Sequence, residues 1–277
     1  MARLGRINKL TIKTIRDYGA LLDGGESGDI LLPGRDLPEN CQPGEEIVVL
    51  VYKDAEDRLL ATTRKPLVTV GRFATLRVLE TTASGAYLDW GVPRDLFVPK
   101  SEQLVQMAKG GQYPVMVFVD ERSGRLLASS KLEKFLDRQP PNYAEGEEVE
   151  LLIYDQSELG YKAVVNQAHA GMLYKNEVFQ RLVVGQELTG YIKKVRADLK
   201  IDLTLKQPGY QAVMDISQTI LEIIKARGGR IAVTDKSPPE EIYALFGVSK
   251  KSFKKAIGAL YQKRLITIDP QGITLVG

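Results

Sequence analysis

The sequence is poor in the side chains from which disulfides, metal sites and most nucleophilic active sites are built. Its 277 residues include one cysteine, Cys41, and one histidine, His169. A single cysteine excludes an internal disulfide and is typical of a reducing compartment. No zinc set, Cys–His dyad or Ser–His–acid triad can be assembled, and neither a P-loop nor a GxGxxG motif is present. We therefore expect no catalytic residue, no metal, no cofactor and no enzymatic activity.

Long apolar runs are also absent. No stretch approaches the ~18 apolar residues of a membrane span, and the first six residues contain no apolar signal core. We therefore expect a cytoplasmic protein without a membrane partner. The chain is 44% hydrophobic and 26% charged, which favours folded cores over disorder. Its net charge of +3 is too small to indicate nucleic acid by itself.

The chain does contain a pattern that is repeated along its length. Gly85-Ala-Tyr-Leu-Asp matches Gly19-Ala-Leu-Leu-Asp at an offset of 66 residues, and Gly111 matches Gly44 at an offset of 67. Gly185 takes the same place in a third, more divergent copy. Because the offset drifts by only one residue over a whole copy, the pattern indicates tandem domains rather than chance similarity.

Each copy has the periodicity of short β-strands. Val115, Val117 and Val119 alternate with their neighbours, and Gly, Pro and Asp turns separate such runs. About five runs fit within ~65 residues, and short strands in that number usually close into a small barrel. Gly19 and Gly85 fall inside strands, where glycine typically marks a bulge or sharp bend.

The motifs of the second copy resemble a known RNA-binding module. Gly85-Ala-Tyr-Leu, Leu96-Phe-Val-Pro and Gly124-Arg-Leu-Leu-Ala-Ser-Ser-Lys are similar to the S1 domain, a five-stranded OB-fold barrel. Three tandem copies followed by a helical tail resemble the conserved virulence factor B family of bacterial RNA-binding proteins, in which three S1 units precede a winged helix. The resemblance implies a multi-domain, mainly β protein: three tandem S1-like OB-fold barrels, then an α+β winged-helix domain.

We expect the domains at 1–66, 67–140, 141–208 and 209–277, with a linker from Lys131 to Asn142 closing the second. In the tail, the period changes to that of helices. Val213–Ala226 forms one apolar stripe, Ser237–Glu240 reads as a capping box, and Ser249 as the cap of the next helix. A hairpin turn follows at 269–272. Helix, strand, two helices and a hairpin is the order of a winged helix.

The resemblance also assigns places at which S1 domains stack bases on rings. Tyr18 and Tyr87 occupy such places in the first and second copies, and Tyr174 takes the family's histidine place in the third. The remaining places in the first two copies hold residues without rings: Leu21, Pro33, Ser84 and Pro99. Since one stacked base contributes ~1–3 kcal/mol, we expect weak binding by either of the first two barrels alone.

The third copy and the tail carry the richest mixture of rings and cations. Single-stranded nucleic acid suits such a mixture, because cations follow phosphates while rings stack on bases. The candidate RNA-binding residues here are Tyr161, Lys162, Tyr174, Lys175, Tyr191, Lys193, Lys194, Lys250, Lys251, Lys254 and Lys255. Alternatively, some of these tyrosines belong to the barrel core, and the tail lysines form only a solvated helix face.

Two other features have competing interpretations. A basic strand in the first copy, with Arg6, Lys9 and Lys13, either presents cations to a ligand or is simply a solvated strand face. Trp90 follows the second strand of its copy and is interpreted as a packing residue rather than a stacking platform. His169 is interpreted as a loop residue rather than a ligand.

These observations predict a non-enzymatic protein that binds single-stranded RNA on its barrels, with the winged helix assisting, and that regulates gene expression. The resemblance carries this prediction more than the composition does. Two alternatives stay open: a protein-interaction scaffold, and a DNA-binding regulator acting through the winged helix. Salt separates them, because nucleic-acid binding weakens steeply with salt and an apolar protein interface does not.

Overall fold

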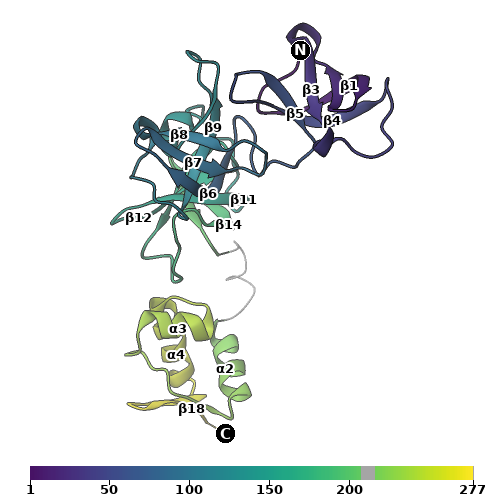
Figure 1. The fold of residues 1–277 in the computed structure, drawn as a ribbon. Coiled ribbons are helices and arrows are strands. Elements are labelled where there is room, and N and C mark those ends of the chain that lie inside the picture. Colours follow the sequence, from purple (N-terminus) through teal and green to yellow (C-terminus); the bar gives the residue numbers. More distant parts are fainter. Residues whose placement is uncertain (207–215, 277) are drawn as a thin grey trace. The chain divides into compact units, whose positions relative to one another are not determined.

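Three closed β-barrels precede a small domain of helices and a hairpin (Figure 1). The computed structural model describes residues 1–206 and 216–276. The chain divides into two compact units. One consists of Met1–Asp137 with Leu152–Tyr154 and Val184–Glu187, and the other comprises the remaining residues.

The first barrel forms from strands whose apolar residues alternate between core and solvent. Its strands are β1 (Ile7–Arg16), β2 (Gly19–Asp23), β3 (Asp29–Pro33), β4 (Glu46–Lys53) and β5 (Leu59–Thr62). They close in the order β1-β2-β3-β5-β4, with β3 and β5 parallel at Leu31 and Leu60. Closure leaves no long unpaired strand edge.

The second barrel repeats this arrangement. It consists of β6 (Phe73–Thr81), β7 (Gly85–Asp89), β8 (Leu96–Pro99), β9 (Gln112–Val119) and β10 (Leu126–Ser129). The parallel pair is again the third and fifth strands, at Phe97 and Leu127. Trp90 is 2% exposed and its Nε1 donates a hydrogen bond to the Arg94 carbonyl at 2.5 Å. The interpretation of Trp90 as a packing residue is therefore confirmed.

Within the first compact unit, the first two barrels share apolar packing. Leu50 and Tyr52 of β4 are 1% and 2% exposed and belong to the core cluster centred on the second barrel. The Val70 amide donates to the Gly5 carbonyl at 2.9 Å. The first two barrels thus pack against each other instead of being joined by the chain alone.

The third barrel has the same strand order despite its divergent sequence. Its strands are β11 (Glu148–Gln156), β12 (Gly160–Val165), β13 (His169–Tyr174), β14 (Glu187–Val195) and β15 (Ile201–Thr204). His169, however, is the first residue of β13, so its interpretation as a loop residue is wrong: it pairs with Val165 in the β12–β13 ladder.

One glycine is required at the start of the second strand of every barrel. A Cβ added to Gly19, Gly85 or Gly160 would lie 2.1, 2.2 or 2.0 Å from a backbone carbonyl of the third strand. Only glycine tolerates so close an approach of two backbones. In the first two barrels, the paired first strand also shifts register near this point. The irregularity expected at Gly19 and Gly85 thus lies in the first strand, and the glycines themselves mark a close approach of two backbones.

The C-terminal domain packs helices against a small sheet. It contains α2 (Ile216–Ala226), β16 (Arg230–Ile231), α3 (Pro239–Phe246), α4 (Lys250–Gln262), β17 (Ile266–Asp269) and β18 (Gly272–Leu275). The sheet order is β16-β18-β17, and Ile220, Ile242 and Phe253 are buried in its core. The predicted helix start at Val213 lies outside the described residues.

The helix caps were predicted with mixed success. Ser249 caps α4, because its side chain accepts a hydrogen bond from the Ser252 amide at 3.1 Å. The capping box at the start of α3 is wrong: Pro238 is the N-cap and provides no side-chain bond. Ser237 instead bonds back to the preceding loop, where its hydroxyl accepts from the Thr234 amide at 3.0 Å. In the linker, Leu132–Phe135 form a 3₁₀ turn.

Candidate nucleic-acid interface

Two rings meet on the outside of the second barrel. Tyr87 of β7 and Phe97 of β8 are directly paired across the strands, and their ring centroids are 4.9 Å apart. Both are half-buried, whereas their chain neighbours, such as Ala86 and Leu96, point into the core. Alternation therefore turns the two rings outward together. Phe97 was missed by the sequence analysis, although its place between two core residues, opposite Tyr87, was a usable signal.

This ring pair borders a cavity of about 260 Å³. Tyr52 of β4 lines it from the first barrel, and Arg94 and Asp95 line it from the loop before β8. Burial raises the pKa of Tyr52, an effect that nearby Arg35 partly opposes. Tyr52 therefore remains a neutral, mostly apolar wall.

In the third barrel, Tyr174 is held by its hydroxyl. This hydroxyl donates to an Asp202 carboxylate oxygen at 3.1 Å and accepts from Arg196 Nη2 at 2.6 Å. Arg196 Nε completes the triangle with a hydrogen bond to Asp202 at 3.1 Å. The ring itself is half-buried at the end of β13. The network fixes the orientation of a ring that lies at the barrel surface.

The other two tyrosines of the third barrel differ from one another. Tyr161 is 9% exposed, so the expectation that its ring is exposed is wrong. It lies on the inward side of β12, as the alternative interpretation of the third copy allowed. Tyr191 is half-buried, and its hydroxyl donates to Glu148 at 3.2 Å. Lost solvation, followed by this hydrogen bond, raises the pKa of Tyr191.

The lysines of the third barrel fall into two classes. Lys162 forms an ion pair with Asp155 at 3.1 Å, and Lys193 forms one with Glu177. Lys175 and Lys194 are exposed and form no ion pair with any residue that the structure describes. The latter two are therefore the better placed to exchange counterions for phosphates.

In the first barrel, the stacking candidate Tyr18 is 60% exposed and lies in the turn before β2. The basic strand is only partly available, because Lys9 pairs with Glu46 and Lys13 pairs with Asp29 at 2.6 Å. The bond to Asp29 raises the pKa of Lys13.

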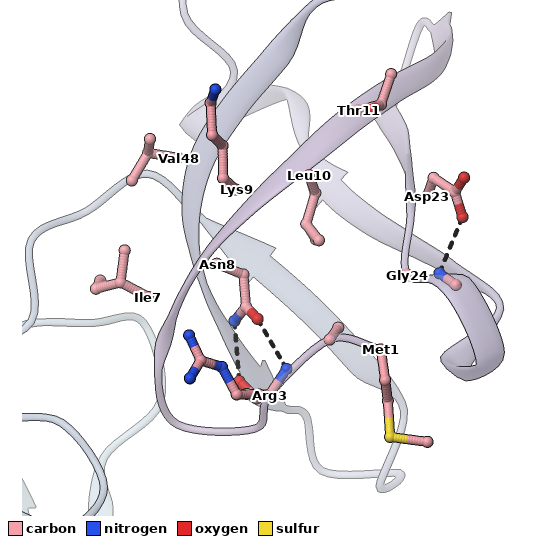
Figure 2. Close-up of a pocket in the computed structure, with 12 residues that line it drawn as sticks. Met1, Arg3, Ile7, Asn8, Lys9, Leu10, Thr11, Asp23, Gly24 and Val48 are labelled. Atoms are coloured by element: carbon pink, nitrogen blue, oxygen red, sulfur yellow. Dashed lines mark hydrogen bonds between the residues drawn. The ribbon is translucent and has the colours of Figure 1, made fainter.

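The outer side of β1 borders an open groove of about 590 Å³ (Figure 2). Figure 2 shows Asn8 bound twice to the backbone of Arg3, at 2.8 and 2.9 Å. Ile7 and Val48 also line the groove and are 43% and 58% exposed. This surface mixes apolar and basic side chains without an aromatic ring.

The four lysines of α4 do not share one environment. Lys251 and Lys255 are exposed and make no ion pair within the described ranges. Lys254 lies 3.5 Å from Asp235, and Lys250 is half-buried with its Nζ donating to the Ser237 carbonyl at 2.8 Å. Of the four, Lys251 and Lys255 are the free cations.

Residues 1–206 and 216–276 contain no group of three His, Cys, Asp or Glu side chains arranged to hold a metal. His169 instead shares a hydrogen bond of 3.0 Å with the Tyr143 hydroxyl through its Nδ1. In the same part of the chain, no helix has the length and apolarity that crossing a membrane requires.

The sequence is similar to known domains over most of its length. The S1 domain model matches residues 4–64 and 70–131, and the CvfB-like winged helix domain model matches residues 218–275. The S1 matches thus fall on the first two barrels, and the winged-helix match on α2 to β18. S1 and winged-helix families are nucleic-acid-binding domains rather than enzymes.

Curated relatives extend along nearly the whole chain. "Conserved virulence factor B" of Staphylococcus epidermidis (strain ATCC 12228 / FDA PCI 1200) is 25% identical over 98% of this chain and 94% of its own. "Uncharacterized protein YitL" of Bacillus subtilis (strain 168) is 26% identical over 93% and 89%. A solved multidomain protein with nucleic acid binding domains from Streptococcus pneumoniae is 23% identical, covers 99% of this chain and 98% of its own, and superposes with a TM-score of 0.44. Two S1 matches, a CvfB-like winged helix match and relatives named conserved virulence factor B along nearly the whole chain confirm the resemblance to that family.

Proposed function

We propose that this protein binds single-stranded RNA on its barrels, without catalysis, and that the winged helix assists. One observation carries the proposal: each barrel has a tyrosine ring outside its core, either on the second or third strand or in the turn just before the second. These rings are Tyr18, Tyr87 and Tyr174. Rings on the outer face of OB-type barrels are platforms on which bases stack.

Cations without ion-pair partners accompany these rings in the described part of the chain. Lys175 and Lys194 lie on the third barrel, and Lys251 and Lys255 on α4. Cations near stacking rings let a strand run its phosphates beside its bases. We assign most of the binding energy to the third barrel and the C-terminal domain, where these four lysines lie and where Arg196 and Asp202 hold the Tyr174 ring in place.

A single strand is favoured over a duplex for a geometric reason. Base faces are available to tyrosine rings only when the bases are unstacked from one another, as in loops and single strands. A protein that holds RNA in this way, without a catalytic group, acts by occupying its target. Regulation of gene expression is the role consistent with such occupancy.

Competition binding tests the proposal. The full chain is bound to a labelled single-stranded RNA at fixed salt and challenged with unlabelled single-stranded RNA, double-stranded RNA and double-stranded DNA. We expect the single strand to compete best and the affinity to fall steeply as salt rises. Equal competition by duplex would refute the proposal. Salt-independent capture of proteins, without RNA binding, would favour a scaffold instead.

A further inference from the structure

The cavity beside Tyr87 and Phe97 has features that general RNA stacking does not require. It lies within the first compact unit, and its volume of about 260 Å³ is below the ~300–1,000 Å³ of typical small-molecule pockets. The Tyr87 and Phe97 rings line it together with Tyr52. A space of this size with aromatic walls suits one flat heterocycle.

Among the described residues, one acidic side chain of this cavity has no partner. The Asp95 carboxylate makes no hydrogen bond or ion pair with any residue in the described ranges. Partial desolvation raises the pKa of Asp95, although its side chain is exposed, and repulsion by Asp89 and Glu80 adds to the effect. An acceptor-only group without a donor, at the rim of an aromatic cavity, is available to a ligand that brings hydrogen-bond donors.

The internal repeat shows that this lack of a partner is specific to the second barrel. Asp95 corresponds to Asp29 in the first barrel, where the carboxylate pairs with Lys13 at 2.6 Å. Lys13 lies at the register shift of β1, between Ile12 and Thr14. The same shift in β6 brackets Leu79, which cannot pair with a carboxylate. The second barrel therefore has the carboxylate, Asp95, but has Leu79 where the first barrel has Lys13.

Guanine provides the donors that such a carboxylate needs. Its Watson–Crick edge carries an N1–H and a neighbouring N2 amino group, two adjacent donors that one carboxylate can accept together. Adenine and cytosine present an amino donor next to an acceptor nitrogen, and uracil presents one N–H between two carbonyls. A bidentate contact to a base edge discriminates by ~1–3 kcal/mol, or about fivefold to more than a hundredfold.

We propose that this cavity binds one unstacked guanine base of RNA, stacked on Tyr87 and Phe97 and held at its Watson–Crick edge by Asp95. The exposed Arg94 also lines the cavity, and Lys53 lines it while donating to the Gly124 carbonyl at 3.1 Å. These two cations face the phosphates on either side of the base. The inference rests on the proposed RNA binding and adds a base preference to it.

The test uses the full chain and short uridine oligonucleotides that carry one central guanosine, inosine or adenosine. Affinities are measured by fluorescence anisotropy at one salt concentration. We expect guanosine to bind about tenfold tighter than adenosine. Inosine, which lacks the N2 amino group, should fall between them. Asp95→Asn should abolish the preference, because its amide offers only one acceptor oxygen.

Asp29→Asn is the matched control, since it changes the equivalent residue in the first barrel. It should leave the guanosine preference intact. Tyr87→Leu should instead lower the affinity for guanosine and adenosine oligonucleotides together. Asp95 is exposed, so its substitution should leave the thermal unfolding transition in place.

The outcomes separate this inference from the RNA proposal. Tight binding of all oligonucleotides with equal affinity would overturn the guanine site and leave RNA binding standing. A preference that survives in Asp95→Asn would equally overturn it. Failure to bind any of the oligonucleotides would overturn both.

Discussion

The second and third barrels share one fold but hold their surface rings in opposite ways. Both have the same strand order and the same parallel closing pair. Tyr174 of the third barrel is tied through its hydroxyl to Arg196 and Asp202. Tyr87 makes no hydrogen bond through its hydroxyl in the described part of the chain, and its ring packs against that of Phe97. The fold thus determines where a ring lies, while its neighbours determine how firmly it is held.

This difference has an energetic consequence for binding. A ring already fixed in orientation loses less conformational entropy when a base stacks on it, since side-chain ordering costs ~0.5–1.5 kcal/mol per mobile group. Tyr174 is pre-organised in this sense. Tyr87 and Phe97 instead offer a broader platform with freedom to adjust. We expect the third barrel to bind more tightly and the second to be more selective.

Loss of one ring from each barrel gives the largest expected effect. Tyr174→Ala should weaken single-stranded RNA binding by roughly 1–3 kcal/mol, the contribution of one stacked base. Tyr87→Ala should cost less on an oligonucleotide without guanosine. Titration of each variant with a uridine oligonucleotide, measured by anisotropy, provides the comparison. A larger loss for Tyr87→Ala would reverse the ranking of the two barrels.

Much of this fold could be predicted from the sequence, because the signals are local and repeated. Alternating apolar residues locate the strands of all three barrels, and the glycine pair Gly19 and Gly85 marks the point where two backbones approach closely. The helical period of the tail locates α2 to α4 in the same way. Period and turn chemistry act within a few residues, so a single sequence reveals them.

The candidate site was less predictable, because it depends on partners distant in the chain. Tyr161 has the same residue type as Tyr174, and only the pairing of β12 within the barrel places it inward. Phe97 becomes a candidate stacking ring only because β7 and β8 pair it with Tyr87. Whether Lys193 is free depends on Glu177 in a separate loop. Such contacts arise from tertiary packing, which the local pattern does not encode.

The salt dependence of RNA binding tests whether the unpaired lysines of the third barrel contact phosphates. Each phosphate contact on a single strand contributes about 0.7 to the slope of log affinity against log salt. Replacing Lys175 and Lys194 with alanine should therefore reduce the slope by about 1.4. The matched control replaces Lys162 and Lys193, whose ion pairs with Asp155 and Glu177 already neutralise them.

The measurement is a series of binding titrations between ~50 and ~200 mM salt. The control pair should change the slope much less than the free pair. Equal changes for the two pairs would mean that the ion pairs open on binding. The ion pairs of the unbound protein would then not indicate which lysines contact phosphates.

The lysines of α4 test whether the winged helix extends the surface of the third barrel. Lys251 and Lys255 lie four residues apart, so their side chains are neighbours within about 6 Å on one helix face. We expect them to share one phosphate, and their joint replacement with alanine to reduce the salt slope by about 0.7. The same replacement of Lys250 and Lys254, which contact Ser237 and Asp235, is the control. An unchanged slope in both variants would remove α4 from the interface.

The smallest expected effect isolates the anchoring of Tyr174 from its ring. Tyr174→Phe keeps the stacking surface but removes the hydroxyl that bridges Arg196 and Asp202. Loss of a hydrogen bond of this kind costs ~0.5–1.5 kcal/mol of stability, and the direct Arg196–Asp202 contact remains to limit the damage. RNA affinity should fall by no more than about tenfold, because re-ordering one ring costs ~0.5–1.5 kcal/mol. Chemical denaturation reports the first effect and anisotropy the second. If Tyr174→Phe binds as poorly as Tyr174→Ala, the hydroxyl network contacts RNA directly, and the third barrel differs from the second in chemistry rather than in rigidity.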